Sequence, residues 1–170
     1  SHTDRITADL AVVDCRTAAA QAEFVACWSA AGLRHATGEA TADAAALWGQ
    51  AWASPSAGGQ PECLVFGPYA SMPPGRYLAA FRLKLGAEPD PGLSAEVPLA
   101  TLDVFAGGYS GTAQVVGKTE VRRRDFGGPD QWTWIGVEGH WDGLPSLMET
   151  RVYWHGQAPL LVDRVVIFRL

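Results

Sequence analysis

Residues 64–85, LVFGPYASMPPGRYLAAFRLKL, decide the fold that the sequence predicts. Gly67-Pro68 interrupts an apolar run, and residues 72–75 (MPPG) form a turn, because proline fixes φ and glycine accepts positive φ. Residues 76–85 then alternate, and one face carries Tyr77, Ala79, Phe81, Leu83 and Leu85. A period of two indicates a long strand with one side facing a core.

Further strand patterns follow at short intervals, separated by glycine- and proline-rich turns. The predicted strands cover residues 63–66, 97–105, 113–123, 132–137, 148–154 and 160–168. Such regular spacing is typical of a sandwich or jelly roll rather than of a βαβ fold. We therefore expect an all-β, antiparallel β-sandwich of the jelly-roll, galactose-binding-like kind, with one or two short N-terminal helical turns.

The first 60 residues are rich in alanine and less clearly patterned. Residues 5–13 alternate as a strand would, and residues 17–28 predict a short helix, with a β-entry segment as the alternative. Residues 43–48 predict one helical turn that leads into a strand through Trp52. We expect residues 1–27 to be an extension or first strand with a short helix, and residues 28–170 to be the sandwich.

Composition excludes several classes of function. The 170 residues carry a net charge of -5, so no basic excess is available to neutralise phosphates and nucleic acid is not an expected partner. The basic run 122–124 is followed at once by Asp125, as in a solvated strand end. No apolar run reaches the ~18 residues of a membrane span, and no signal peptide is visible.

The three cysteines, Cys15, Cys27 and Cys63, do not form a regular disulfide framework. A bridge between Cys27 and Cys63 is one interpretation, and free buried thiols are the favoured one. Without a CxxC pair, structural zinc is not expected.

Tryptophan is the residue type that most suggests a ligand. Sugars lay their C–H faces on aromatic rings, and Trp adds one N–H donor. Four of the seven tryptophans fall in or beside predicted loops, with a histidine and an aspartate next to one of them, so the expected ligand-binding residues are Trp48, Trp52, Trp132, Trp141, His140 and Asp142. Trp28, Trp134 and Trp154 are expected to fill the core.

No catalytic constellation stands out. Glycosidases need two carboxyl groups ~5–10 Å apart, and nothing in the sequence pairs two of the acids. Asp103 is instead expected to form a cross-strand ion pair with Arg82 or Arg151. No nucleophile motif such as GxSxG is present, so the chain is not expected to be an enzyme.

Four segments in order resemble the carbohydrate-binding modules of families 6 and 35: residues 33–52, 64–85, 130–134 (DQWTW) and 160–167 (LLVDRVVI). The stretch containing GPY and PPGRY is the most specific. The resemblance implies a structural calcium site, for which Glu23 and Asp163 are the candidate ligands. The sequence departs from the pattern near Gly32, where no carboxylate stands, and just before Asp163, where no asparagine stands.

The resemblance also implies the function. We expect a non-catalytic module that recognises a polysaccharide or glycan through loop aromatics. Ser1-His2 is typical of the remnant of a cleaved tag, so we expect a domain taken from a larger protein. The sequence leaves the location unknown, and the resemblance favours a place outside the cell or in its envelope, beside a neighbouring domain. The alternative is a protein-interaction or structural accessory sandwich that binds no sugar.

Overall fold

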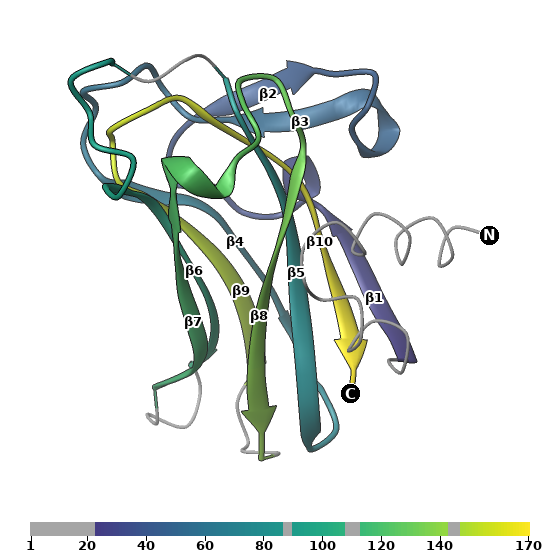
Figure 1. Ribbon diagram of the computed structural model, residues 1–170. Coiled ribbons are helices and arrows are strands. Elements are labelled where there is room, and N and C mark those ends of the chain that lie inside the picture. Colours follow the sequence, from purple (N-terminus) through teal and green to yellow (C-terminus); the bar gives the residue numbers. More distant parts are fainter. Residues whose placement is uncertain (1–22, 87–89, 108–112, 143–146) are drawn as a thin grey trace.

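The computed structural model describes residues 23–86, 90–107, 113–142 and 147–170, and these form two antiparallel sheets packed face to face (Figure 1). Sheet A has the order β2-β3-β10-β5-β8, and β1 also pairs with β10. Its strands are β1 (Glu23–Ser29), β2 (Glu39–Ala42), β3 (Gln50–Ala53), β5 (Gly75–Leu85), β8 (Thr133–Trp141) and β10 (Leu160–Arg169). The expected β-sandwich is confirmed.

Sheet B has the order β4-β9-β6-β7. Its strands are β4 (Glu62–Ala70), β6 (Pro98–Gly107), β7 (Gln114–Arg122) and β9 (Leu147–Trp154). Three short 3-10 turns complete the described part: η1 (Ala30–Gly32), η2 (Leu47–Gly49) and η3 (Arg123–Asp125). The basic run therefore does lie at a strand end, where β7 passes into η3.

The fold-deciding stretch crosses from one sheet to the other. β4 lies in sheet B and β5 in sheet A, and the turn between them is fixed by a hydrogen bond from the Tyr77 hydroxyl to the Pro73 carbonyl at 2.6 Å. Gly67-Pro68 was expected to end the first strand. Instead β4 continues through it, with a register shift against β9 between Pro68 and Ala70. Gly67-Pro68 therefore marks a β-bulge rather than the end of a strand.

The core lies between the inner faces of the two sheets. From β5, Phe81, Leu83 and Leu85 point into it as the alternation predicts, and they meet residues such as Leu102 and Val152 of sheet B. A second apolar cluster lies on the outer face of sheet A and contains Leu78, Ala80, Trp134, Val166 and Phe168. Both faces of β5 are thus buried over part of its length.

The prediction of a helix over residues 17–28 is wrong for residues 23–28, the part of this range that the structure describes. Residues 23–29 are strand β1, paired with β10 from Glu23 opposite Arg169 to Ser29 opposite Arg164. Ladder hydrogen bonds to β10 outweigh the helix propensity of an alanine-rich segment. The expected boundary at residue 28 falls inside this strand. Residues 5–13 and 17–22 lie outside the described residues.

The helical turn and strand expected between residues 43 and 52 agree better with the structure. A short 3-10 turn, η2, does lead into β3, which pairs with β2 and with the start of β10.

The described cysteines, Cys27 and Cys63, are free, and burial raises the pKa of the Cys63 thiol to about 11. Cys15 lies outside the described residues. No described helix has the length and apolar character needed to cross a membrane.

Candidate functional site

Of the four tryptophans expected to bind a ligand, Trp48 is the most open to solvent. It lies in η2 with 83% of its surface exposed, while its backbone has φ 56° and ψ 23°. Left-handed backbone is unfavourable for a bulky residue, so the surrounding chain must hold it there.

Trp52 has a structural partner. Its ring stacks on His35 with centroids 3.4 Å apart and planes 8° apart, and its indole N–H donates to the Thr37 carbonyl at 2.8 Å. The His35 ring also bonds the Ala30 carbonyl at 2.7 Å, and burial lowers its pKa. One face of Trp52 is therefore covered by a neutral imidazole.

Trp132 is half-buried and lies among charges. The Arg82 guanidinium lies 5.0 Å from a ring centroid of Trp132, and the Lys84 ammonium lies 4.9 Å from one. These are cation–π distances, so the ring already has two cationic partners.

Trp141 was expected in a loop, and the structure corrects this. It is the last residue of β8 and only 2% exposed, and it packs in the core between the sheets. His140 and Asp142 on either side are exposed, as the alternation of a strand requires. A ligand on the surface can meet those two but not the indole between them.

The six expected residues do not converge on one place. Trp132 immediately precedes β8 and His140 lies near its other end, eight residues or about 26 Å away at the rise of a strand. Trp48 and Trp52 belong to a different hairpin. Trp132, however, adjoins the turn before Trp48, because its ring lies against Arg82 and Lys84, which bond Ala45 and Asp43. The six residues therefore fall into more than one group and do not form a single site.

The two candidate calcium ligands also lie apart. Glu23 is opposite Arg169 at one end of the β1–β10 ladder, whereas Asp163 precedes Arg164 at the other end, about 20 Å away. Within the described ranges, no three His, Cys, Asp or Glu side chains are grouped so that they could hold a metal ion. Glu23 and Asp163 cannot share a calcium ion.

A different surface gathers polar and aromatic side chains, namely the outer face of sheet B. Alternation along β9 turns Met148, Val152 and Trp154 inward to the core. The alternate residues Arg151, Tyr153 and His155 point outward, and we name this series the β9 row. The period of two in residues 148–155 (METRVYWH) indicates this outward series, but the expectation of loop tryptophans as contacts did not include it.

Arg151 anchors the middle of this face. Its guanidinium makes a two-pronged ion pair with Asp103, directly opposite on β6, at 2.8 and 2.6 Å. The expected pairing of Asp103 is thus confirmed for Arg151, whereas Arg82 pairs elsewhere. The guanidinium also lies 4.0 Å from the Phe105 ring centroid, and its bond to Asp103 raises the pKa of Arg151.

Glu149 lies two residues before Arg151 on the same face of β9 and is buried. Neighbouring positive charges balance the charge of its carboxylate only in part. Burial raises the pKa of its carboxyl group, although Arg151 and a hydrogen bond with Tyr69 act in the opposite direction. Arg34 lies over the Tyr69 ring at 5.1 Å. The carboxyl group therefore keeps its proton to higher pH than an exposed glutamate does.

The far end of the β9 row is aromatic and open. Tyr153 is 43% exposed and meets the His155 ring edge to face, with centroids 5.6 Å apart. His155 bonds the Thr101 hydroxyl at 2.7 Å, and burial lowers the pKa of its imidazole. A neutral imidazole at pH 7 offers one donor and one acceptor.

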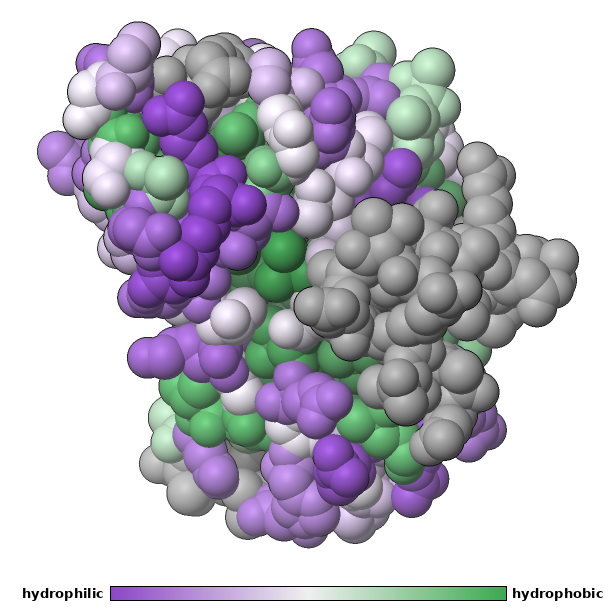
Figure 2. All heavy atoms as spheres, viewed as in Figure 1, coloured by the Kyte–Doolittle hydropathy of each residue, from purple (hydrophilic) through white to green (hydrophobic). Residues whose placement is uncertain are grey.

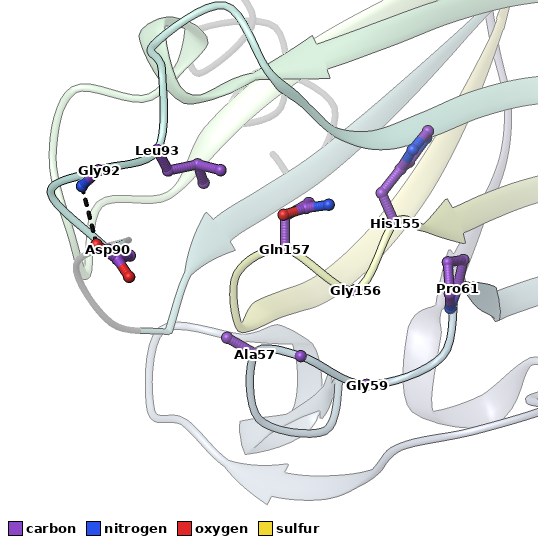
Figure 3. Close-up of a pocket in the computed structure, with 10 residues that line it drawn as sticks. Ala57, Gly59, Pro61, Asp90, Gly92, Leu93, His155, Gly156 and Gln157 are labelled. Carbon is purple, nitrogen blue, oxygen red and sulfur yellow. Dashed lines mark hydrogen bonds between the residues drawn. The ribbon is translucent and has the colours of Figure 1, made fainter.

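A pocket of about 720 Å³ opens beside His155 (Figure 3). Loops from three parts of the chain line it, and their polar side chains are those of Asp90, His155 and Gln157. The Asp90 carboxylate also accepts the Gly92 N–H at 2.8 Å, drawn as a dashed line in Figure 3.

Glycines bring two of these loops together. The Gly58 N–H donates to the Gly156 carbonyl at 2.8 Å, and Gly156 has φ +79°. A Cβ on Gly156 would strike the Gly59 carbonyl, and one on Gly59 would lie 2.8 Å from the Trp154 ring. Backbone therefore forms this wall of the pocket because no side chain fits there.

His155 belongs both to the β9 row and to the pocket, so the two form one continuous surface. It combines an exposed aromatic ring, a fixed ion pair and several uncharged hydrogen-bonding groups. Such a mixture of apolar surface and a few placed polar groups is typical of small-molecule sites. It suits a ligand that has both C–H faces and hydroxyl groups.

Comparison with protein-family models found no match, and comparison with curated proteins likewise found none. Solved structures do match. A family 6 carbohydrate-binding module from Cellvibrio mixtus lichenase 5A, in complex with cellotriose, aligns with a TM-score of 0.58 and 15% identity. The alignment covers 86% of this chain and 98% of that one.

Two further structures agree. The C-terminal family 6 module of a laminarinase from Zobellia galactanivorans gives a TM-score of 0.57 at 13% identity, covering 85% of this chain and 98% of that one. A family 16 carbohydrate-binding module gives 0.51 at 17%, covering 82% and 92%. The chain therefore has the β-sandwich fold of the carbohydrate-binding modules.

Proposed function

We propose that this domain binds a polysaccharide or glycan through the β9 row and the pocket beside it. The observation that carries the proposal is the position of Tyr153, an exposed ring between the Arg151–Asp103 pair and the pocket wall at His155. Aromatic surface and planar polar groups in contact are what a sugar ring needs.

Each part of the surface has a role in this proposal. The Tyr153 ring takes the C–H face of a sugar. The Arg151–Asp103 pair and the His155 imidazole offer hydrogen bonds to its hydroxyl groups, and the pocket, with Gln157 and Asp90 on its walls, accommodates a neighbouring sugar unit. Because the ion pair is already formed, little side-chain entropy is lost on binding.

The fold supports the choice of first ligand. The lichenase 5A module that this fold matches was solved with cellotriose. Soluble β-glucans are therefore the first polysaccharides to test, followed by a wider glycan array.

The loop tryptophans keep a smaller part in the proposal. Trp48 is proposed as a second contact because its ring is the most exposed of the four. Trp52 and Trp132 have protein partners on their rings, and Trp141 is buried, so these three are not proposed as contacts. Derivation from a larger protein and an envelope location remain proposals that rest on the resemblance.

The test is affinity gel electrophoresis on polysaccharides chosen from the array. The variant Tyr153→Ala/His155→Ala should lose at least tenfold in affinity, since one stacked ring and one hydrogen-bonding group contribute roughly 1.5–3 kcal/mol together. The control Tyr77→Phe alters a buried tyrosine of the other sheet and should bind normally.

Two results would overturn the proposal. Normal affinity in the double variant would remove the site, and a blank array with the wild-type domain would remove the function. A blank array together with association of a neighbouring domain would favour the accessory-domain alternative.

A further inference from the structure

Asp163 is a completely buried carboxylate on the outer side of sheet A. The register of β10 against β5 shifts between Val162 and Arg164, so Asp163 is the extra residue of a β-bulge. A bulge re-aims side chains, and here it brings the carboxylate against Arg82 of β5.

Both carboxylate oxygens of Asp163 are occupied. Oδ1 accepts the backbone N–H of Leu47 at 2.7 Å. Oδ2 lies 2.8 Å from Nη1 of Arg82 and 3.2 Å from Nε of Arg164. The side chain therefore has a complete set of partners from this chain.

Arg82 has a second oxygen partner. The same Nη1 donates to the Ala45 carbonyl at 2.7 Å. A carboxylate and a backbone carbonyl are the oxygen ligands that calcium takes in proteins. The guanidinium of Arg82 thus lies between the two kinds of group that would otherwise hold a cation.

Local charge argues against an additional ion. Asp163 contributes one negative charge and the two guanidiniums contribute two positive charges, so this group is already positive. Next to Arg82 on the same strand, Lys84 pairs with Asp43 at 2.6 Å and lies 3.6 Å from Asp130. A divalent cation at Asp163 would therefore meet the guanidinium groups of Arg82 and Arg164 at close range, whereas Lys84 is already paired with Asp43.

We propose that Arg82 is a built-in structural cation, in the place that the family resemblance assigns to calcium, and that it positions the turn that carries Trp48. The domain then folds without calcium. The inference concerns this turn and not the β9 row, so its test is independent of the test of sugar binding by Tyr153 and His155.

The positioning follows from the contacts on either side of Trp48. Ala45 is held through its carbonyl by Arg82, and Leu47 is held through its N–H by Asp163. Trp48 follows directly, in left-handed backbone and exposed. The buried pair therefore over-determines the turn, which is the condition under which a strained residue persists.

The first experiment uses the unaltered protein. Thermal unfolding is followed with EDTA and with added calcium. The expected result is the same midpoint temperature in both. A lower midpoint in EDTA that calcium restores would overturn the proposal.

The second experiment removes the cation. Arg82→Ala should lower the midpoint by about 10 °C, because it leaves a buried carboxylate without its main partner. Amide hydrogen exchange at Leu47 should accelerate at the same time, ahead of amides in β9. If this variant does not fold, Arg82→Lys keeps the charge without the planar fork and should show the same local change to a smaller degree.

Arg76→Ala is the matched control. Arg76 lies on the same strand and the same face, but its pair with Glu138 is exposed on both sides. Exposed pairs contribute little, so its midpoint and the exchange at Leu47 should stay as in the wild type. Equal behaviour of the Arg82 and Arg76 variants would overturn the assignment.

Discussion

The outer faces of the two sheets differ in chemistry although both arise from the same strand alternation. On sheet A, Leu78, Trp134 and Phe168 form an apolar cluster that is buried. The hydrophobic surface that Figure 2 shows in the middle and lower part of the molecule lies between hydrophilic groups. On sheet B, the β9 row presents charge, hydroxyl and imidazole groups with partial exposure. The outer face of sheet A therefore combines a packing cluster with the buried Asp163–Arg82 pair, whereas the outer face of sheet B presents polar groups and an exposed ring.

The contrast indicates that the outer faces of a β-sandwich, rather than its inner faces, carry the information about ligand binding. The inner faces of both sheets must be apolar, so they say little about what the protein does. Buried ion pairs occur on both outer faces, so the feature that distinguishes sheet B is the exposed Tyr153 ring beside the pair, which packing does not explain. Mutations on the two outer faces should therefore separate stability from binding.

The largest expected effect is on the apolar face. Phe168→Ala should lower the free energy of unfolding by about 4 kcal/mol, because the ring is buried in the second cluster and meets Phe24 edge to face. Urea unfolding measures this. A loss below about 1 kcal/mol would show that the cluster contributes little packing.

Removing the ion pair on sheet B should come next. Arg151→Ala should lower the free energy of unfolding by about 2–3 kcal/mol, since Asp103 is then left nearly buried without its partner. The double variant with Asp103→Ala should recover part of that loss in a double-mutant cycle. Additive single effects would contradict the coupling that the geometry implies.

Tyr153→Ala alone is expected to affect binding more than stability. Affinity for a bound polysaccharide should fall about tenfold, while the free energy of unfolding changes by less than about 1 kcal/mol because the ring is exposed. Calorimetry and urea unfolding measure the two quantities. The reverse pattern would make the sheet B face a packing surface like that of sheet A.

Glu149 gives a smaller, pH-dependent effect. Its pKa is raised in the folded state, so the folded protein binds a proton more tightly than the unfolded chain, and stability falls as pH rises above the ordinary glutamate value. Glu149→Gln removes this loss. We expect the midpoint to rise by roughly 2 °C at pH 7 and to be unchanged near pH 4. A gain that is equal at both pH values would contradict this cause.

The smallest expected effect concerns Trp48. Trp48→Asn should stabilise the domain by up to about 1 kcal/mol, because asparagine tolerates the left-handed backbone better. If Trp48 is a second sugar contact, affinity falls in the same variant. Loss of stability would show instead that the ring is packed, against its exposure.

Local patterns were sufficient for much of the fold. The alternation of residues 76–85 predicted β5 and its core face, and the proline- and glycine-rich segments marked most turns. Asp103 was correctly expected to pair with an arginine across strands. These features depend on the period of a strand and on turn chemistry, which neighbouring residues set.

The candidate site was less accessible from the sequence. Trp141 was expected in a loop, but the register of β8 places its side chain in the core. Tyr153 was not among the expected residues, although the register of β9 places its ring on the surface. A shift of one residue reverses the face of every side chain, and the pairing partners that set it are distant in the sequence.

The alternation and the turn residues were enough to predict a β-sandwich with apolar inner faces, because a period of two depends on local sequence. The pairing of residues 23–29 with β10, the contact of Asp163 with Arg82 rather than with Glu23, and the pocket beside the β9 row became visible only in three dimensions. Each of these depends on which distant segments pack together, and the free energy of that packing is spread over the whole chain.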